Sequence, residues 1–226
     1  MKIIEFIKNE IKTYNAIEIS FFLIILCLII FNAIYFKDSP IAVISAISGM
    51  LYTINAGKGK IICYFYGLLG SFCYSYLAFK NAFWGNLALY FFYYIPSEIT
   101  GIFLWKKHIK KETNTIIKAK LGNKNRLILL LIAFFGSIIL SIVLKYFNDS
   151  NPFVDGFATF LSIIGMYLTL RRLIEQWYIW AVVNFLSCAM WIGAILKGEP
   201  VYSTATMWFA YFLLSFYFLK EWRKEV

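Results

Sequence analysis

Histidine is nearly absent from this sequence, and cysteine is sparse. His108 is the only histidine, and the four cysteines lie singly inside apolar segments. A metal site needs several Cys, His or acidic ligands at close spacing, so no metal is expected. A nucleophile with a matched base is missing too, since His108 lies among lysines just after an apolar run. We therefore expect neither an enzyme nor a cofactor. The sequence also contains no G-x-x-x-x-G-K-[ST] run, so no ATP site is expected.

Charged residues are also few, at 15% of the 226, whereas 61% of the residues are hydrophobic and 20% are aromatic. A composition this apolar predicts an integral membrane protein. The net charge of +10 could suggest a nucleic-acid partner, but the basic residues separate apolar runs instead of forming one stripe. We therefore expect the chain to lie in a lipid membrane and to bind no nucleic acid.

Eight apolar runs follow an amphipathic start, residues 1–15, which is suited to the membrane surface. Most of these runs approach the roughly 20 residues that a helix needs to cross about 30 Å of hydrocarbon. The sequence therefore predicts an all-α protein with eight transmembrane helices, at residues 19–36, 41–56, 61–79, 82–105, 127–147, 153–170, 177–196 and 201–219.

The basic residues predict the orientation. If eight helices alternate and the N-terminus is cytoplasmic, all of the 22 lysines and arginines except Lys37, Lys80, Lys145 and Lys197 lie on the cytoplasmic side. This asymmetry agrees with the positive-inside rule. Both termini are therefore predicted to be cytoplasmic.

The two halves of the chain resemble each other. Ser39-Pro40 corresponds to Asn151-Pro152, and Lys58-Gly59-Lys60 corresponds to Leu170-Arg171-Arg172. We therefore expect two parallel three-helix repeats joined by one helix, a 3+1+3 arrangement, with one extra helix in front. The predicted divisions are 1–38 (amphipathic N-terminus and extra helix), 39–105 (first repeat), 106–126 (basic loop), 127–151 (linker helix) and 152–226 (second repeat and basic C-terminus).

The seventh run contains the clearest candidate site. Trp177, Trp180 and Asn184 recur at i, i+3 and i+7, so two indoles and an amide share one helix face next to Gln176. An Asn inside an apolar helix needs a partner helix or a cavity. The pattern is therefore compatible with a helix-packing contact, and equally with a site that stacks an aromatic, polar ligand.

The fourth run supplies a second polar face, with Tyr90, Tyr94 and Glu98 one turn apart and Pro96 nearby. An acidic side chain inside a membrane is a functional candidate, so Glu98 could hold a cationic substrate, transfer a proton, or pair with Arg171 or Arg172. Glu98 and Asn184 each lie seven residues from the cytoplasmic end of their run, at about 10 Å depth. They could therefore face one cavity.

Further candidates lie in the second half. Trp208 and Tyr211 of the eighth run are placed like the aromatics of the fourth. Asp155, near the outer surface, could be part of a gate or an exposed carboxylate at a helix start. Arg171 is the second gate candidate, at the opposite end of the same run.

Several of these motifs together resemble one family. Gln176-Trp177-x-x-Trp180-x-x-x-Asn184, the segment from Asp155 to Met166, Arg171-Arg172, Tyr64-Phe65-Tyr66-Gly67 and Gly101-x-x-x-Trp105 are similar to motifs of the PnuC family of bacterial nicotinamide riboside transporters. The resemblance covers about residues 46–105 and 152–222.

This resemblance implies a SWEET-like fold, a homotrimer in the bacterial inner membrane, and uptake of nicotinamide riboside, an NAD precursor, by facilitated diffusion. A cytoplasmic nucleoside kinase would trap the imported nucleoside. Trp180 and Trp177 would stack the ring, Asn184 would bind its carboxamide or ribose, and Tyr90, Tyr94, Tyr211 and Glu98 would line the cavity. Gly70, Phe91 and Glu98 replace amide side chains expected in the family, so thiamine could be the substrate instead. A non-transporting scaffold or a sugar carrier would also fit these residues.

Overall fold

The computed structural model describes residues 13–37, 39–80, 87–111, 113–147, 152–196 and 202–226. Most of the predicted amphipathic start, together with Asn151 and Lys197, lies outside the described residues. The described elements are α2 (Ala16–Phe36), α3 (Pro40–Lys58), α4 (Cys63–Lys80), the π-helix η1 (Leu89–Tyr94), α6 (Ile95–Lys106), β1 (Ile109–Lys110), β2 (Thr115–Ile116), α7 (Asn123–Tyr146), α8 (Pro152–Leu170), α9 (Gln176–Leu196) and α10 (Tyr202–Arg223).

The regular structure of the described residues is helical, as predicted, apart from a short antiparallel β1–β2 ladder in the basic loop that sequence reasoning did not predict. Within the described residues, α2, α3, α7 and α8 are long and apolar enough to cross a membrane by length and composition. The protein is thus a multi-pass membrane protein.

Local signals set several helix ends. The Asn15 side chain accepts from the backbone amide of Glu18, and the Glu18 side chain accepts from the backbone amide of Asn15. These two bonds form a capping box that starts α2. Pro40 follows the Ser39 cap of α3, and Gly59 ends α3 in the left-handed conformation, at a φ of 71°. A short turn therefore leads directly from α3 into α4.

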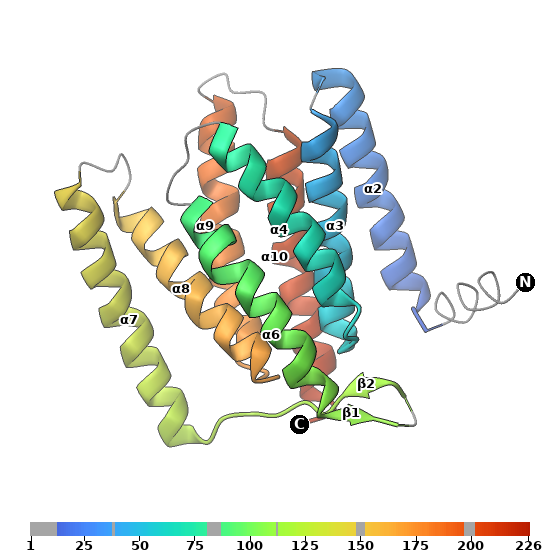
Figure 1. The fold of residues 1–226 in the computed structure, drawn as a ribbon, viewed down its shortest axis with the longest axis vertical. Helices are drawn as coiled ribbons and strands as arrows, with labels where there is room; N and C mark the ends of the chain where they lie inside the picture. Colours follow the sequence, from blue (N-terminus) through green and yellow to red (C-terminus); the bar gives the residue numbers. More distant parts are fainter. Residues whose placement is uncertain (1–12, 38, 81–86, 112, 148–151, 197–201) are drawn as a thin grey trace, which may run out of the picture.

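The helices pack as two groups with crossed contacts. Helix α3 packs on α4 and α4 on α6, while α8 packs on α9 and α9 on α10 (Figure 1). Between the groups, α10 contacts α3 and α6 contacts α8. Helix α7 lies at the edge, against α8. The third helix of each group thus contacts the first helix of the other group.

Two buried tryptophans form equivalent hydrogen bonds across these crossed contacts. The indole nitrogen of Trp105, at the end of α6, donates to the carbonyl oxygen of Thr169 in α8, over 3.0 Å. The indole nitrogen of Trp222, at the end of α10, donates to the carbonyl oxygen of Gly57 in α3, over 2.7 Å. Both indoles are fully buried, so each bond is made away from water.

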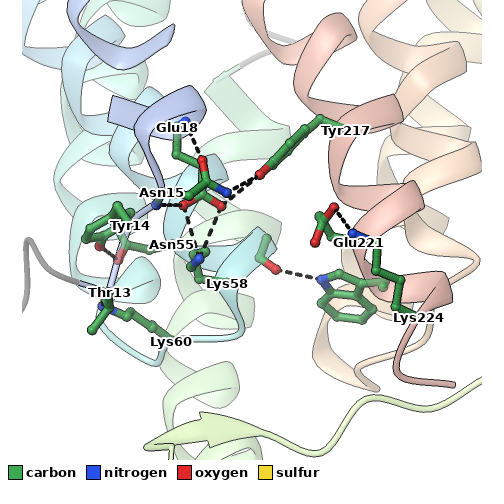
Figure 2. Close-up of polar contacts among 12 residues, drawn as sticks. Thr13, Tyr14, Asn15, Glu18, Asn55, Lys58, Lys60, Tyr217, Glu221 and Lys224 are labelled. Carbon is green, nitrogen blue, oxygen red and sulfur yellow. Dashed lines mark hydrogen bonds and ion pairs between the residues drawn. The ribbon is translucent and has the colours of Figure 1, made fainter. Parts of the chain in front are cut away.

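Helix α2 is anchored by polar contacts at its first turn (Figure 2). Lys58 reaches both carboxylate oxygens of buried Glu18, at 3.2 and 3.0 Å, and the Tyr217 hydroxyl donates to the same carboxylate. The Tyr14 hydroxyl donates to Asn55 over 2.7 Å. The extra helix is therefore attached both to α3 and to α10.

Candidate functional site

A narrow internal cavity of about 110 Å³ lies between the two groups of helices. Helices α3, α4, α6, α8, α9 and α10 and the π-helix η1 all contribute side chains to its wall. The cavity brings together all nine predicted binding residues, namely Tyr90, Tyr94, Glu98, Gln176, Trp177, Trp180, Asn184, Trp208 and Tyr211.

Trp180 is held in one orientation from two sides. Its indole nitrogen donates to the Thr169 hydroxyl over 3.0 Å, and that hydroxyl donates in turn to the Gly165 carbonyl. A Cβ at Gly165 would lie 3.0 Å from the Trp180 ring, so glycine is what lets the ring approach α8 closely. Helix α8 therefore fixes an aromatic face at the cavity.

Asn184 is buried one turn further along α9. Its amide nitrogen donates to the Ser215 hydroxyl over 3.0 Å, and Ser215 donates to the Tyr211 carbonyl over 2.8 Å. This chain of bonds links α9 to α10 and fixes the orientation of the amide group. The helix-packing role and the ligand-binding role considered for Asn184 are thus compatible, because a side chain that lines the cavity also makes the interhelical bond.

Glu98 is buried, with 4% of its surface exposed. Its Oε1 accepts a hydrogen bond from the Ser71 hydroxyl over 3.0 Å, whereas Oε2 has no partner among the described residues. The pairing with Arg171 or Arg172 considered for Glu98 is wrong. Arg172 donates to the Ile117 carbonyl, and neither arginine lines the cavity. The carboxylate is left with an acceptor that a ligand can use.

A π-helix places the tyrosines of the fourth run. In η1 the Ile95 amide donates to the Tyr90 carbonyl, five residues back, just before Pro96. Tyr90 stacks on Tyr74 at a centroid distance of 4.2 Å and meets Tyr94 edge to face at 4.8 Å. Sequence reasoning did not predict this wide helical turn, which directly precedes Pro96. Three rings cover this part of the cavity wall.

The remaining predicted residues close another part of the wall. Trp177 is buried and packs on Phe218 and Trp222 at centroid distances of 5.4 and 5.7 Å. The Gln176 amide donates to the Leu173 carbonyl over 3.0 Å. Among the described residues, the indole nitrogens of Trp177 and Trp208 have no acceptor. They are donors that a polar ligand could use.

The two gate candidates lie away from the cavity wall. Asp155 is in the first turn of α8, and Arg171 follows the end of that helix. Of the positions that depart from the expected family pattern, Gly70 and Glu98 line the cavity, whereas Phe91 is 48% exposed and does not.

Sequence reasoning missed several wall residues. Ser71 and Thr169, which hold Glu98 and Trp180, are ordinary hydroxyls in apolar helices. Tyr52, Tyr74 and Met207 also line the cavity. The similarity of the two halves is the one signal that pointed to Thr169. Thr169 precedes Leu170 as Gly57 precedes Lys58, so the two residues occupy equivalent positions in the two halves.

The charge of the wall determines what it can bind. Glu98 is the only formally charged side chain among the described wall residues, and the rest are aromatic, hydroxyl, amide, apolar or small. No group of three potential metal ligands occurs among the described residues. Aromatic faces and a carboxylate together stabilise a flat cation. A helical membrane protein with such an internal cavity has the construction of a transporter.

Comparison with known proteins identifies the family. Residues 39–224 match the family model described as nicotinamide mononucleotide transporter. The chain is 31% identical over 191 residues to "Nicotinamide riboside transporter PnuC" of Haemophilus influenzae, covering 84% of this chain and 81% of that relative. For the same-named protein of Neisseria mucosa, identity is 29% over 198 residues, with 85% and 75% covered.

A solved structure agrees with these relatives. "Crystal structure of the Vitamin B3 transporter PnuC" superposes with a TM-score of 0.83 at 27% identity, covering 94% of this chain and 93% of that one. The chain belongs to the nicotinamide mononucleotide transporter family, and it is similar to the PnuC transporters over most of its length. The resemblance to PnuC expected from the sequence is confirmed.

Proposed function

We propose that this protein takes up nicotinamide riboside across the bacterial inner membrane through the cavity that contains Trp180, Asn184 and Glu98. The names of the relatives support the substrate. The observation that favours it most is the composition of the wall, in which aromatic rings surround a buried carboxylate whose Oε2 has no partner among the described residues. Nicotinamide riboside is a flat cationic ring that carries an amide and hydroxyl groups.

The charge of the wall favours the riboside over the mononucleotide for which the family is described. A mononucleotide adds a phosphate, whose negative charge needs lysine, arginine or several backbone donors. None of the described wall residues is basic, and Glu98 would repel the phosphate. The nucleoside has a positive ring without that phosphate. We therefore infer that the substrate is the dephosphorylated form.

In the proposed complex, the pyridinium ring stacks on Trp180, with Trp177 as a second indole nearby. A cation over an indole face gains about 0.5–2 kcal/mol. Asn184 binds the carboxamide or a ribose hydroxyl, and Glu98 acts as the counter-charge. The remaining proposed contacts are with Gln176, Tyr90, Tyr94, Trp208 and Tyr211.

We further propose that the two helix groups are parallel repeats, at residues 39–105 and 152–226, joined by a linker helix at 127–151 in a SWEET-like 3+1+3 arrangement. Residues 1–38 and the basic loop 106–126 lie outside the repeats. The equivalent bonds of Trp105 and Trp222 support this pairing. In such an arrangement the substrate lies between the copies, and rocking of one against the other exposes it to either side.

Facilitated diffusion with cytoplasmic phosphorylation would make uptake effective without an ATP site. The distribution of lysine and arginine supports cytoplasmic N- and C-termini. The first turn of α2, the β1–β2 ladder and the C-terminus lie at the same end of the bundle (Figure 1), which is compatible with that orientation. A homotrimer and gate roles for Asp155 and Arg171 remain predictions from the family resemblance and the sequence.

Counterflow in proteoliposomes tests the proposal. Vesicles loaded with unlabelled nicotinamide riboside should accumulate labelled nicotinamide riboside from outside, whereas labelled mononucleotide should not exchange. Exchange of thiamine instead would show that Gly70 and Glu98 have changed the substrate. If none of the vitamins exchanges in protein shown to be folded by its thermal transition, the protein is not a carrier of this class.

A further inference from the structure

A second cavity, of about 650 Å³, opens between α7 and α8 on the outside of the bundle. It is separate from the substrate cavity and shares no wall residue with it. We call it the α7–α8 groove. Its wall includes Leu129 and Leu168, which are partly or fully buried, and Ile128, Ile132 and Tyr167, which are 44%, 52% and 53% exposed. The long sides of the groove are therefore apolar.

One end of the groove is basic. Arg171 and Arg172 follow the last turn of α8, and His108 and Asn125 complete this end. No carboxylate lines the groove among the described residues. Glu175, which follows the two arginines in the sequence, is occupied by Arg126 at 2.7 Å and by the Leu121 amide at 3.2 Å.

The positive charges of the two arginines are therefore poorly balanced by nearby carboxylates. Arg172 donates to the Ile117 carbonyl, but this is a neutral acceptor. Within the described part of the chain, the exposed Arg171 side chain takes part in no ion pair. Burial, followed by the neighbouring charge of Arg171, lowers the pKa of Arg172 from its ordinary value. Two adjacent guanidinium groups without a carboxylate form a site for an anion.

The polar and apolar parts are arranged along the membrane normal. Asn125 and Ile132 on α7 are seven residues apart, which is about 10 Å along a helix. Helices α7 and α8 are both long and apolar enough to cross a membrane, and a span along them would place the basic end at the headgroups and the apolar walls in the hydrocarbon region. A soluble anion would use only the arginines and leave the apolar length empty.

We propose that the α7–α8 groove binds one anionic phospholipid, with the phosphate at Arg171 and Arg172 and an acyl chain along Ile128 and Ile132. Basic pockets between membrane helices commonly recognise anionic headgroups in this way. The site has a structural connection to the substrate cavity, because Leu168 lines the groove and the next residue, Thr169, holds Trp180. A lipid bound here would contact the turn of α8 that positions the substrate-stacking indole.

Native mass spectrometry of the purified full-length protein tests this proposal, with phosphatidylglycerol and phosphatidylcholine as matched probes. The expected result is one retained phosphatidylglycerol per chain, in preference to phosphatidylcholine. Arg171→Gln should weaken retention of phosphatidylglycerol about fivefold, the effect of one basic residue near the surface. Lys220→Gln removes the same charge from exposed Lys220 of α10 and should leave retention unchanged.

A second pair of variants tests the apolar part of the groove. Ile132→Trp fills the groove and should reduce phospholipid retention, whereas Ile139→Trp, at a 62% exposed position two turns away, should not. Equal retention of both lipids, or undiminished retention in Arg171→Gln, would overturn the proposal. So would a change of subunit number with Ile132→Trp without any loss of lipid, because the groove would then be covered by a second copy of the chain.

Discussion

The hydroxyl of Ser71 donates to Oε1 of Glu98 over 3.0 Å, and this is the one hydrogen bond that the buried carboxylate makes with the described residues. A buried carboxylate with an unsatisfied oxygen is costly to maintain in the empty protein. The cost is offset when a cation enters. Glu98 is therefore expected to weaken the stability of the empty protein and strengthen substrate binding.

This trade-off leads to a prediction for Glu98→Gln. The neutral amide keeps the shape and removes the charge, so the thermal transition of the empty protein should rise, while affinity for nicotinamide riboside should fall at least about tenfold. Thermal shift and calorimetry on the same preparation measure both. A variant that loses stability and affinity together would mark Glu98 as a structural residue.

Asn184→Leu is expected to abolish specific uptake, because leucine can bind neither a carboxamide nor a ribose hydroxyl. Ser215→Ala is the matched control. It removes the partner of the Asn184 amide but leaves the amide itself in the cavity. Uptake by this control should fall only partly, through loss of orientation. Undiminished uptake by Asn184→Leu would remove Asn184 from the binding site.

Two glycines near the cavity are predicted to differ in their tolerance of a methyl group. A Cβ at Gly165 would lie 3.0 Å from the Trp180 ring, whereas at Gly70 the nearest atom would be 3.5 Å away. Gly165→Ala should lower the free energy of unfolding by about 1–3 kcal/mol, the usual cost of overpacking, and should weaken substrate binding because it displaces the indole. Gly70→Ala should bind nearly normally. Titration of both variants with nicotinamide riboside compares them, and equal affinities would contradict the role given to Trp180.

The indole bonds between the helix groups predict matched stability losses. Trp105→Phe and Trp222→Phe each remove a buried indole hydrogen bond and some buried side-chain volume, although the Thr169 carbonyl still accepts from the Arg172 backbone amide. Each should lower the free energy of unfolding by about 2 kcal/mol. Trp208→Phe is the control, since the Trp208 nitrogen has no acceptor among the described residues. Denaturation in detergent distinguishes them, and a loss in the control as large as in the other two would argue against these bonds.

Much of the fold and site could be predicted because both depend on patterns along single helices. Apolar runs of membrane-spanning length indicated the helices, and polar side chains inside them pointed to the cavity. Trp180, Asn184 and Glu98 could be found in this way, since water cannot satisfy polar groups at that depth. Their placement on one wall follows from helix periodicity together with the similarity of the two halves.

What the sequence could not supply depends on contacts between helices. The Thr169 hydroxyl donates to the Gly165 carbonyl one turn earlier in α8, as hydroxyls in many helices do. Nothing in the sequence therefore marks Thr169 as the residue that holds Trp180. The π-helix before Pro96 is a local register change that periodicity does not reveal. Arg171 is a gate candidate by its position at a helix end, but in the structure it lies on the outer α7–α8 groove.

Glu98 is expected to select a cationic ring, and one binding comparison tests this role most directly. Nicotinamide riboside and its reduced dihydropyridine form share the ribose and carboxamide but differ in the charge of the ring. Calorimetry should show that the wild-type protein binds the cationic form at least about tenfold more tightly, and that Glu98→Gln loses most of this preference. Equal affinity of the wild-type protein for both forms, or an undiminished preference in Glu98→Gln, would contradict the selection of a cation by Glu98.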